Sequence, residues 1–380
     1  MLETNNASID HIIPFSYSGV KKDSEGFIDK HDFNGCMNIL KSVHFEDQIS
    51  NANKDILNSD SEIFSHLKNL MIGLNGDNSE SLLTNHLIGA YITHSRVIEK
   101  GKKHKYFYVQ SAEESDTYQI KIPYYRLYFF KTGIGFFHIH FDIENVNTYD
   151  EFVQINSDLK SLHNFKKNNG KYHIKAKTNN DPKLNLDAFD CYEYAEFVNL
   201  GLASFEGVSF FSGTHNSPSK ALCFNHCLIN SNLKSKDNDL FKSLLRASKG
   251  YNRKYSINLE VNHYNNISNG NEIYAPFDDV LWAISREGIS NITLDDDTRP
   301  FLGSGIASRI EKNYLYLYLI LLHQYYGLIH LSNQISNLPS NVKAYTSSNV
   351  ASGDNFDNLI RLRDDVHFFY LKCVYEEVSN

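Results

Sequence analysis

The chain has 380 residues, of which 41% are hydrophobic, and it contains 25 phenylalanines and 24 tyrosines. This composition excludes a disordered protein and is sufficient for a large core in two or three domains. The formal net charge of −8 argues against a dedicated nucleic-acid binder, so we expect no direct contact with nucleic acid. Five scattered cysteines exclude a disulfide framework, and the first residues lack the pattern of a signal peptide, which indicates the cytosol or its membrane face.

The first part of the chain, residues 1–103, is interpreted as mixed and partly helical. Spaced apolar residues, interrupted by polar clusters, predict helices at residues 33–43, 61–74 and 79–100. The hydrophobic period then changes to two, which predicts strands at residues 105–110, 117–122, 124–130 and 135–143. The last two are joined by the short sequence KTGI, so we expect a hairpin.

The segments after this hairpin alternate between the two periods. Residues 148–162 predict a helix that begins with a capping box, Thr148 followed by Glu151. Further patterns predict strands at 171–176, 221–229 and 250–261, and helices at 188–205 and 238–248. Residues 274–288 are expected to lead out of the folded unit.

The C-terminal region predicts two helices. In residues 309–336 a seven-residue seam of Tyr314, Leu321, Leu328 and Ile335 is typical of packing against a partner helix. A second apolar stripe in residues 355–380 favours an antiparallel helical hairpin. The apolar middle contains two histidines and a glutamine, so we interpret it as a buried or oligomerising helix rather than a membrane span.

These elements predict a mixed α/β fold, with a largely antiparallel or mixed sheet flanked by helices and followed by a long helical stalk. We place the α/β domain at residues 1–290 and the stalk at residues 291–380.

Three side chains form the sharpest metal-like pattern. His138, His140 and Asp142 share one face of a predicted strand, where neighbours on the same face lie about 6.6 Å apart along the backbone. Imidazole nitrogens at this spacing are able to converge on one ion. A polar strand face that faces solvent or is covered by a helix predicts the same alternation.

Sequence signatures of catalysis are lacking. The chain has no G-x-S-x-G elbow, no P-loop and no G-x-G-x-x-G fingerprint, so we do not predict an enzyme. The acidic runs at residues 278–279 and 295–297 are candidates for Mg²⁺ ligands, although such runs more often cap helices or mark turns.

Two basic and aromatic groups suggest anion recognition. Arg246, Tyr251 and Arg253 lie in a basic stretch interleaved with aromatic residues, which suits phosphate binding and base stacking. Trp282 is the only tryptophan, and Arg286 follows it by four residues, a spacing that would make them neighbours on a helical turn. A solvated basic face and a core tryptophan are the plainer alternatives.

Three blocks resemble a known family. YRLYFFKTGIGFFHIHFDIENVNTYDEFVQINSDLKSL is similar to the strand–turn–strand–helix unit of divergent CorA-like membrane proteins. YAPFDDVLWAISREG and YLYLYLILLHQYYGLIHLSNQI resemble the passage from their cytosolic α/β domain into its helical part. The resemblance covers about half of the chain, from Tyr125 to the end.

The resemblance implies a cytosolic sensor domain, a stalk and membrane helices in a ring, usually a pentamer. The Gly-Met-Asn signature of the metal-ion channels is absent from this sequence, which puts magnesium transport in doubt. No membrane helix is evident either, so any membrane part is expected after Asn380.

Some CorA-like proteins accompany type III CRISPR systems, where they are thought to act in antiviral defence. In this role they are membrane effectors gated by a nucleotide messenger, a conjugate of S-adenosylmethionine with AMP. The resemblance therefore implies a small nucleotide-like ligand, without an obligatory cofactor, at the cytoplasmic face of the membrane. The candidate ligand-binding residues are Trp282, Arg286, Arg246, Tyr251, Arg253, Asn156 and Lys160.

Two alternatives remain open at this point. A metal-dependent nucleotide hydrolase would need His138, His140 and Asp142 to meet a further acid. A divalent-cation sensor or transport domain would use the acidic runs.

Overall fold

The centre of the fold is a strand close to the N-terminus, β1 (Thr4–Ser16). The computed structural model describes residues 4–22, 26–32, 35–36, 38–40, 92–93, 104–111, 119–165, 170–178, 190–214, 217–229, 238–250, 273–277, 280–294, 310, 314–336 and 353–373. Strand β1 was not predicted, because its segment was assigned to the mixed and partly helical region. Its alternation is weaker than that of the hairpin that follows, because His11 lies on the face of Ile9 and Ile13 and Ile12 lies on the face of Asp10.

The main sheet has 12 strands and is mixed, which confirms the predicted fold class. Its order is β15 (Ile273–Phe277), β16 (Val280–Ser285), β17 (Gly288–Leu294), β14 (Leu222–Ile229), β1, β7 (Ile134–Glu144), β6 (Gln119–Phe129), β5 (His104–Ser111), β8 (Tyr172–Thr178) and β9 (Asp190–Tyr192). Two short strands, β4 (Ile92–Thr93) and β11 (Ser209–Phe210), pair with β6 and β1. Strands β14 and β17 are parallel, and the helix α6 (Asn238–Lys249) lies between them in the chain.

Two small sheets are separate from the main sheet. One contains β10 (Phe205–Glu206), β2 (Gly19–Lys21) and β3 (Phe27–Asp29), and the other contains β12 (Gly213–Thr214) and β13 (Ser217–Pro218).

The predicted hairpin is confirmed as β6 and β7. The turn between them closes with a hydrogen bond from the Gly133 amide to the Phe130 carbonyl at 2.9 Å. Gly133 has φ +83°, a conformation that a residue with a Cβ rarely adopts, so glycine is needed at this position. The helix after the hairpin is also confirmed: α4 (Tyr149–Lys160) begins with the Thr148 hydroxyl accepting a hydrogen bond from the Glu151 amide at 3.2 Å.

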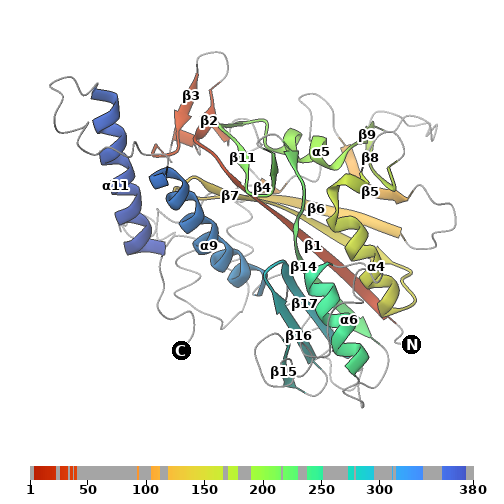
Figure 1. Cartoon of the computed structure of the whole chain (residues 1–380). Helices are drawn as coiled ribbons and strands as arrows, with labels where there is room; N and C mark the ends of the chain where they lie inside the picture. The colour runs from red at the N-terminus through yellow and green to blue at the C-terminus, as the bar shows by residue number, and fades with distance from the viewer. Residues whose placement is uncertain are drawn as a thin grey trace, which may run out of the picture.

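Helices cover both faces of the sheet (Figure 1). Helices α4, α5 (Tyr194–Gly201) and α6 pack on the face that carries the apolar side of β7. The long helix α9 (Leu315–Ser336) crosses the opposite face, and α11 (Gly353–Cys373) lies beside it. The predicted helical hairpin is thus formed by α9 and α11. Among the described residues, no helix is both long and apolar enough to cross a bilayer.

A histidine in α9 anchors this helix to the sheet. The His323 ring stacks on Phe130 at a centroid distance of 4.2 Å, and its Nε2 lies 2.8 Å from the Thr132 hydroxyl. Burial lowers the pKa of His323 to about 3, so the ring is neutral at physiological pH. Helix α11 is held in turn by an ion pair between Lys30 and Asp365 at 3.2 Å.

Some other predictions require correction or lie outside the described residues. Within the predicted helix 79–100, the described residues Ile92 and Thr93 form a strand. Residues 274–288 do not lead out of the folded unit, because their described part lies in β15, β16 and the start of β17 of the main sheet. Residue 290, where the α/β domain was predicted to end, also lies in β17. The predicted helix at 61–74 and the predicted strand at 250–261, apart from Gly250, lie outside the described residues.

A glycine at the α9–α11 contact gives a test of this packing. A Cβ added at Gly327 would overlap the ring of Phe369 on α11. Alanine is about 1 kcal/mol better than glycine inside a helix, whereas overpacking costs about 1 to 3 kcal/mol. We therefore expect Gly327→Ala to destabilise the wild type but to stabilise the Phe369→Ala variant, measured by urea unfolding followed by circular dichroism. An effect of the same sign in both backgrounds would contradict this contact.

Candidate functional site

The predicted metal residues lie on β7 together with an unpredicted acid from β1. Asp10 pairs with His140 across the two strands, and its Oδ1 accepts hydrogen bonds from His138 Nε2 and His140 Nδ1, both at 2.7 Å. The other nitrogen of His140, Nε2, lies 2.9 Å from Asp142 Oδ1. These four side chains are called the Asp–His network. Asp10, His138 and His140 are buried, whereas the side chain of Asp142 is 44% exposed.

The geometry of the network assigns the protons. Both nitrogens of His140 face carboxylate oxygens, so both donate, and the ring is an imidazolium between two carboxylates. His138 donates through Nε2, and burial lowers its pKa although Asp10 opposes this effect. Burial alone would raise the pKa of Asp10, but the nearby His140 and His138 more than offset it and hold the pKa well below its usual value.

This arrangement does not support the predicted metal site at His138, His140 and Asp142. The three side chains share a face as predicted, but the nitrogens of His140 and one nitrogen of His138 are engaged with carboxylates. Within the described part of the chain, no three His, Cys, Asp or Glu side chains are placed to hold an ion. The acidic runs at residues 278–279 and 295–297 lie outside the described residues.

Aromatic and cationic side chains of β6 extend the network. The Tyr124 ring stacks on His140 with a centroid distance of 4.7 Å and an interplanar angle of 4°. The Arg126 guanidinium carbon lies 3.9 Å from the centroid of the Tyr124 ring, on β6. The network therefore continues onto β6 as alternating charged and aromatic groups, of which Tyr124 and Arg126 are half-buried.

Two predicted ligand residues on α4 instead cap a neighbouring helix. Asn156 Nδ2 donates to the Ala247 carbonyl at 2.7 Å, and Lys160 Nζ donates to the Lys249 carbonyl. Asn225 on β14 donates to the same Ala247 carbonyl at 2.9 Å. These donors satisfy carbonyls at the C-terminal end of α6, where a positive charge is also favourable. Burial lowers the pKa of Lys160.

The remaining predicted ligand residues are divided between two places. Arg246 lies on α6, which covers the same face as α4, whereas Trp282 belongs to the core cluster on the α9 face. Trp282 and Arg286 are not neighbours on a helical turn: Trp282 is in β16 and Arg286 is in the turn that follows. Tyr251 and Arg253 lie outside the described residues.

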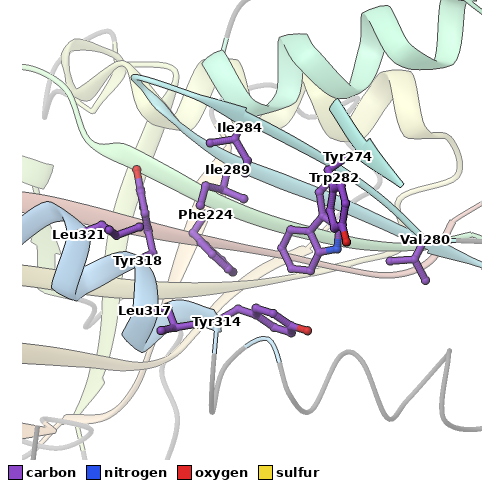
Figure 2. Close-up of a pocket in the computed structure, with 10 residues that line it drawn as sticks. All are labelled: Phe224, Tyr274, Val280, Trp282, Ile284, Ile289, Tyr314, Leu317, Tyr318 and Leu321. Atoms are coloured by element: carbon purple, nitrogen blue, oxygen red, sulfur yellow. The ribbon is translucent and has the colours of Figure 1, made fainter. Parts of the chain in front are cut away.

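Trp282 lines an aromatic pocket (Figure 2). It has a volume of about 450 Å³ and lies between the sheet and the N-terminal half of α9. Its sheet wall consists of Phe224, Tyr274, Val280, Trp282, Ile284 and Ile289, and its helix wall consists of Tyr314, Leu317, Tyr318 and Leu321. The rings of Trp282 and Tyr314 are 5.0 Å apart with an angle of 52°, and those of Phe224 and Tyr318 are 5.7 Å apart.

Arg286 is close in sequence to this pocket but is not among the residues that line it. It follows the wall residue Ile284 by two positions, in the turn after β16, and its side chain is exposed. The nearby Tyr325, one helical turn after the wall residue Leu321, raises the pKa of Arg286. Sequence reasoning found Trp282 and Arg286 but missed the aromatic residues from β14, β15 and α9, which only the tertiary fold brings to them.

The pocket and the Asp–His network are neighbours on one face of the sheet. Phe224 in the pocket wall pairs with Asp10 across β14 and β1. A single row of paired residues therefore leads across the strands from the pocket to the network: Ile284, Ile289, Phe224, Asp10, His140 and Tyr124. The register that the network imposes on β1 also positions the pocket wall.

Comparisons of this chain with protein-family models, curated proteins and solved structures found no match.

Because Asp10 is at the centre of the network, we expect its substitution to lower the free energy of unfolding strongly. Asp10→Asn removes the charge that the buried imidazolium of His140 requires, and breaking a buried pair in this way costs about 3 to 5 kcal/mol. The matched change Asp142→Asn removes an exposed carboxylate from the same network and is expected to cost less than about 1 kcal/mol. Urea unfolding of both variants measures the difference. Equal losses would show that the network does not depend on Asp10.

The stability difference between wild type and Asp10→Asn is expected to depend on pH. The native pKa of Asp10 is lowered, so its charge contributes stability that is fully present above the ordinary value of about 3.9. This contribution is lost as the pH falls through the lower native pKa. We expect the stability difference between wild type and Asp10→Asn to shrink as the pH falls below about 4. A difference that grows on acidification would contradict the assignment.

Proposed function

We propose that this chain is a ligand-sensing protein and that its aromatic pocket binds a nucleotide-like messenger. The observation that carries the proposal is the pocket itself, which has five aromatic side chains among its lining residues. Its volume of about 450 Å³ is within the range of about 300 to 1,000 Å³ typical of small-molecule sites.

The chemistry of the pocket suits a flat base with an anionic group attached. The Trp282 and Tyr314 rings offer stacking surfaces, and stacking of a base on an aromatic ring contributes about 1 to 3 kcal/mol. The walls are apolar, so charged phosphates would lie at the rim rather than between the rings. Arg286 follows the wall residue Ile284 by two positions, and we propose it as the rim arginine, because its planar guanidinium would match two phosphate oxygens at once.

The family resemblance extends this proposal. We propose that the chain is the cytosolic domain of a CorA-like membrane effector in type III CRISPR antiviral defence, assembled as a ring and gated by an S-adenosylmethionine–AMP conjugate. In support, the first of the resembling blocks folds as the continuous unit β6, β7 and α4, and the C-terminal block folds as α9. Because α9 forms one wall of the pocket, a ligand would contact this helix directly and could bias it between two arrangements.

A metal-dependent nucleotide hydrolase is less well supported. It needed a further acid beside His138 and His140, and Asp10 is such an acid. That acid, however, satisfies the histidines by hydrogen bonds, and the described residues offer no group suited to an ion.

The single tryptophan makes the pocket directly observable. Trp282 is the only tryptophan in the sequence and lines the pocket, so its fluorescence reports on ligands that stack there. We expect quenching by S-adenosylmethionine–AMP, with ATP, cyclic oligoadenylates, adenosine and inorganic phosphate as comparisons. Failure of every adenine-containing compound to change the emission or to bind by calorimetry would overturn the proposed function.

Substitution of the rim arginine tests the phosphate assignment. A hydrogen bond to a charged group contributes about 1.5 to 3 kcal/mol, so Arg286→Ala should weaken ATP binding by about tenfold or more. Adenosine, which lacks phosphates, should bind this variant as it binds the wild type. The control Arg363→Ala removes an exposed arginine from α11 and should leave both affinities unchanged. Equal ATP affinity of Arg286→Ala and wild type would place the phosphates elsewhere.

A further inference from the structure

The seven-residue seam predicted on α9 is exposed in the folded chain. Its residues Tyr314, Leu321, Leu328 and Ile335 are 37%, 47%, 56% and 50% exposed. Helix α11 packs on another side of α9, where Phe369 lies against Gly327. Large exposed apolar residues at a spacing of seven are typical of a helix that packs against a second helix.

The chemistry of α9 favours a second copy of the same helix as that partner. In two-stranded coiled coils, charged residues beside the seam select the partner. The 22 residues of α9, from Leu315 to Ser336, include no Asp, Glu, Lys or Arg. Two copies of this helix therefore meet without like-charge repulsion, and the helix has no charged residues that would select a different partner.

The seam and the mouth of the aromatic pocket form one surface. Two seam residues, Tyr314 and Leu321, also line the pocket. The sheet side of the pocket adds two more exposed side chains, Tyr274 at 62% and Ile284 at 48%. These residues lie across the pocket from the helix wall (Figure 2). A helix that packs along the seam would therefore lie over the open side of the pocket.

We propose that α9 of a second copy packs on the seam and closes the pocket, so that the enclosed site is complete only in the assembled protein. The seam contact would bury side chains that are about half exposed in a single chain, and burial of apolar area is the main driving force of such association. Assembly of several copies and a ligand in the enclosed space rest on the proposed function, whereas the packing of α9 on the seam and the closure of the pocket go beyond it.

Assembly is tested with a seam residue that does not line the pocket. Leu328→Glu places a charge in the seam, and sedimentation equilibrium should show a smaller species than for the wild type. The matched control Tyr370→Glu changes a residue of α11 that is 69% exposed and lies off the seam, and it should assemble as the wild type does. Circular dichroism melting confirms that both variants are folded. A monomeric wild type, or equal assembly of Leu328→Glu and wild type, would overturn the proposal.

Closure is tested without any ligand. Ile284→Cys puts a thiol at the mouth of the pocket, and its labelling by a maleimide is measured after subtraction of the same chain without this cysteine. We expect labelling to be at least tenfold slower in the assembled protein than in the Leu328→Glu background. Equal rates in the two backgrounds would show that the pocket is not closed by the second copy. Because both tests omit nucleotides, a failure of nucleotide binding would leave their result intact and would count against the proposed function alone.

Discussion

The structure depends on one buried carboxylate. Asp10 accepts hydrogen bonds from His138 and His140 across the β1–β7 pair, and a charge in this position without partners would cost several kcal/mol. A shift of β1 by one residue would turn Asp10 to the opposite, apolar face of the sheet. The network therefore defines the register of β1, and β1 in turn positions β14, whose Phe224 is part of the pocket wall.

The two faces of the sheet use polar residues differently. On the face of α4 and α6, buried amides and Lys160 satisfy the carbonyl groups at the end of α6, so polar residues there join helices to one another. On the face of α9, Asp10 and His226 bond to side chains of neighbouring strands. The apolar residues of this face instead pack against α9 and line the pocket. A ligand in the pocket would thus meet one wall that is held by strand pairing and one that is held by side-chain packing.

Sequence patterns were sufficient where the deciding interactions are local. The hairpin turn at Gly133 and the cap at Thr148 depend on neighbours within a few residues, and both were predicted correctly. Strand β1 was missed because Asp10 and His11 interrupt its hydrophobic pattern, and both are accommodated by distant partners. For the same reason Lys160 was read as a ligand residue: its charge is evident in the sequence, but its acceptor, 89 residues away, is not. The pocket combines residues from four strands and a helix, which no local pattern could join.

The position of β1 in the chain also has a consequence for biosynthesis. Ile12 in this strand pairs with Leu222, roughly 210 residues later, so β1 is synthesised well before this partner. At synthesis rates of about 5 to 20 residues per second, a nascent β1 waits about 10 to 40 seconds for that partner. Its other partner, β7, also follows later in the chain, and until both partners have been synthesised β1 has an unpaired edge, which favours aggregation of a nascent chain.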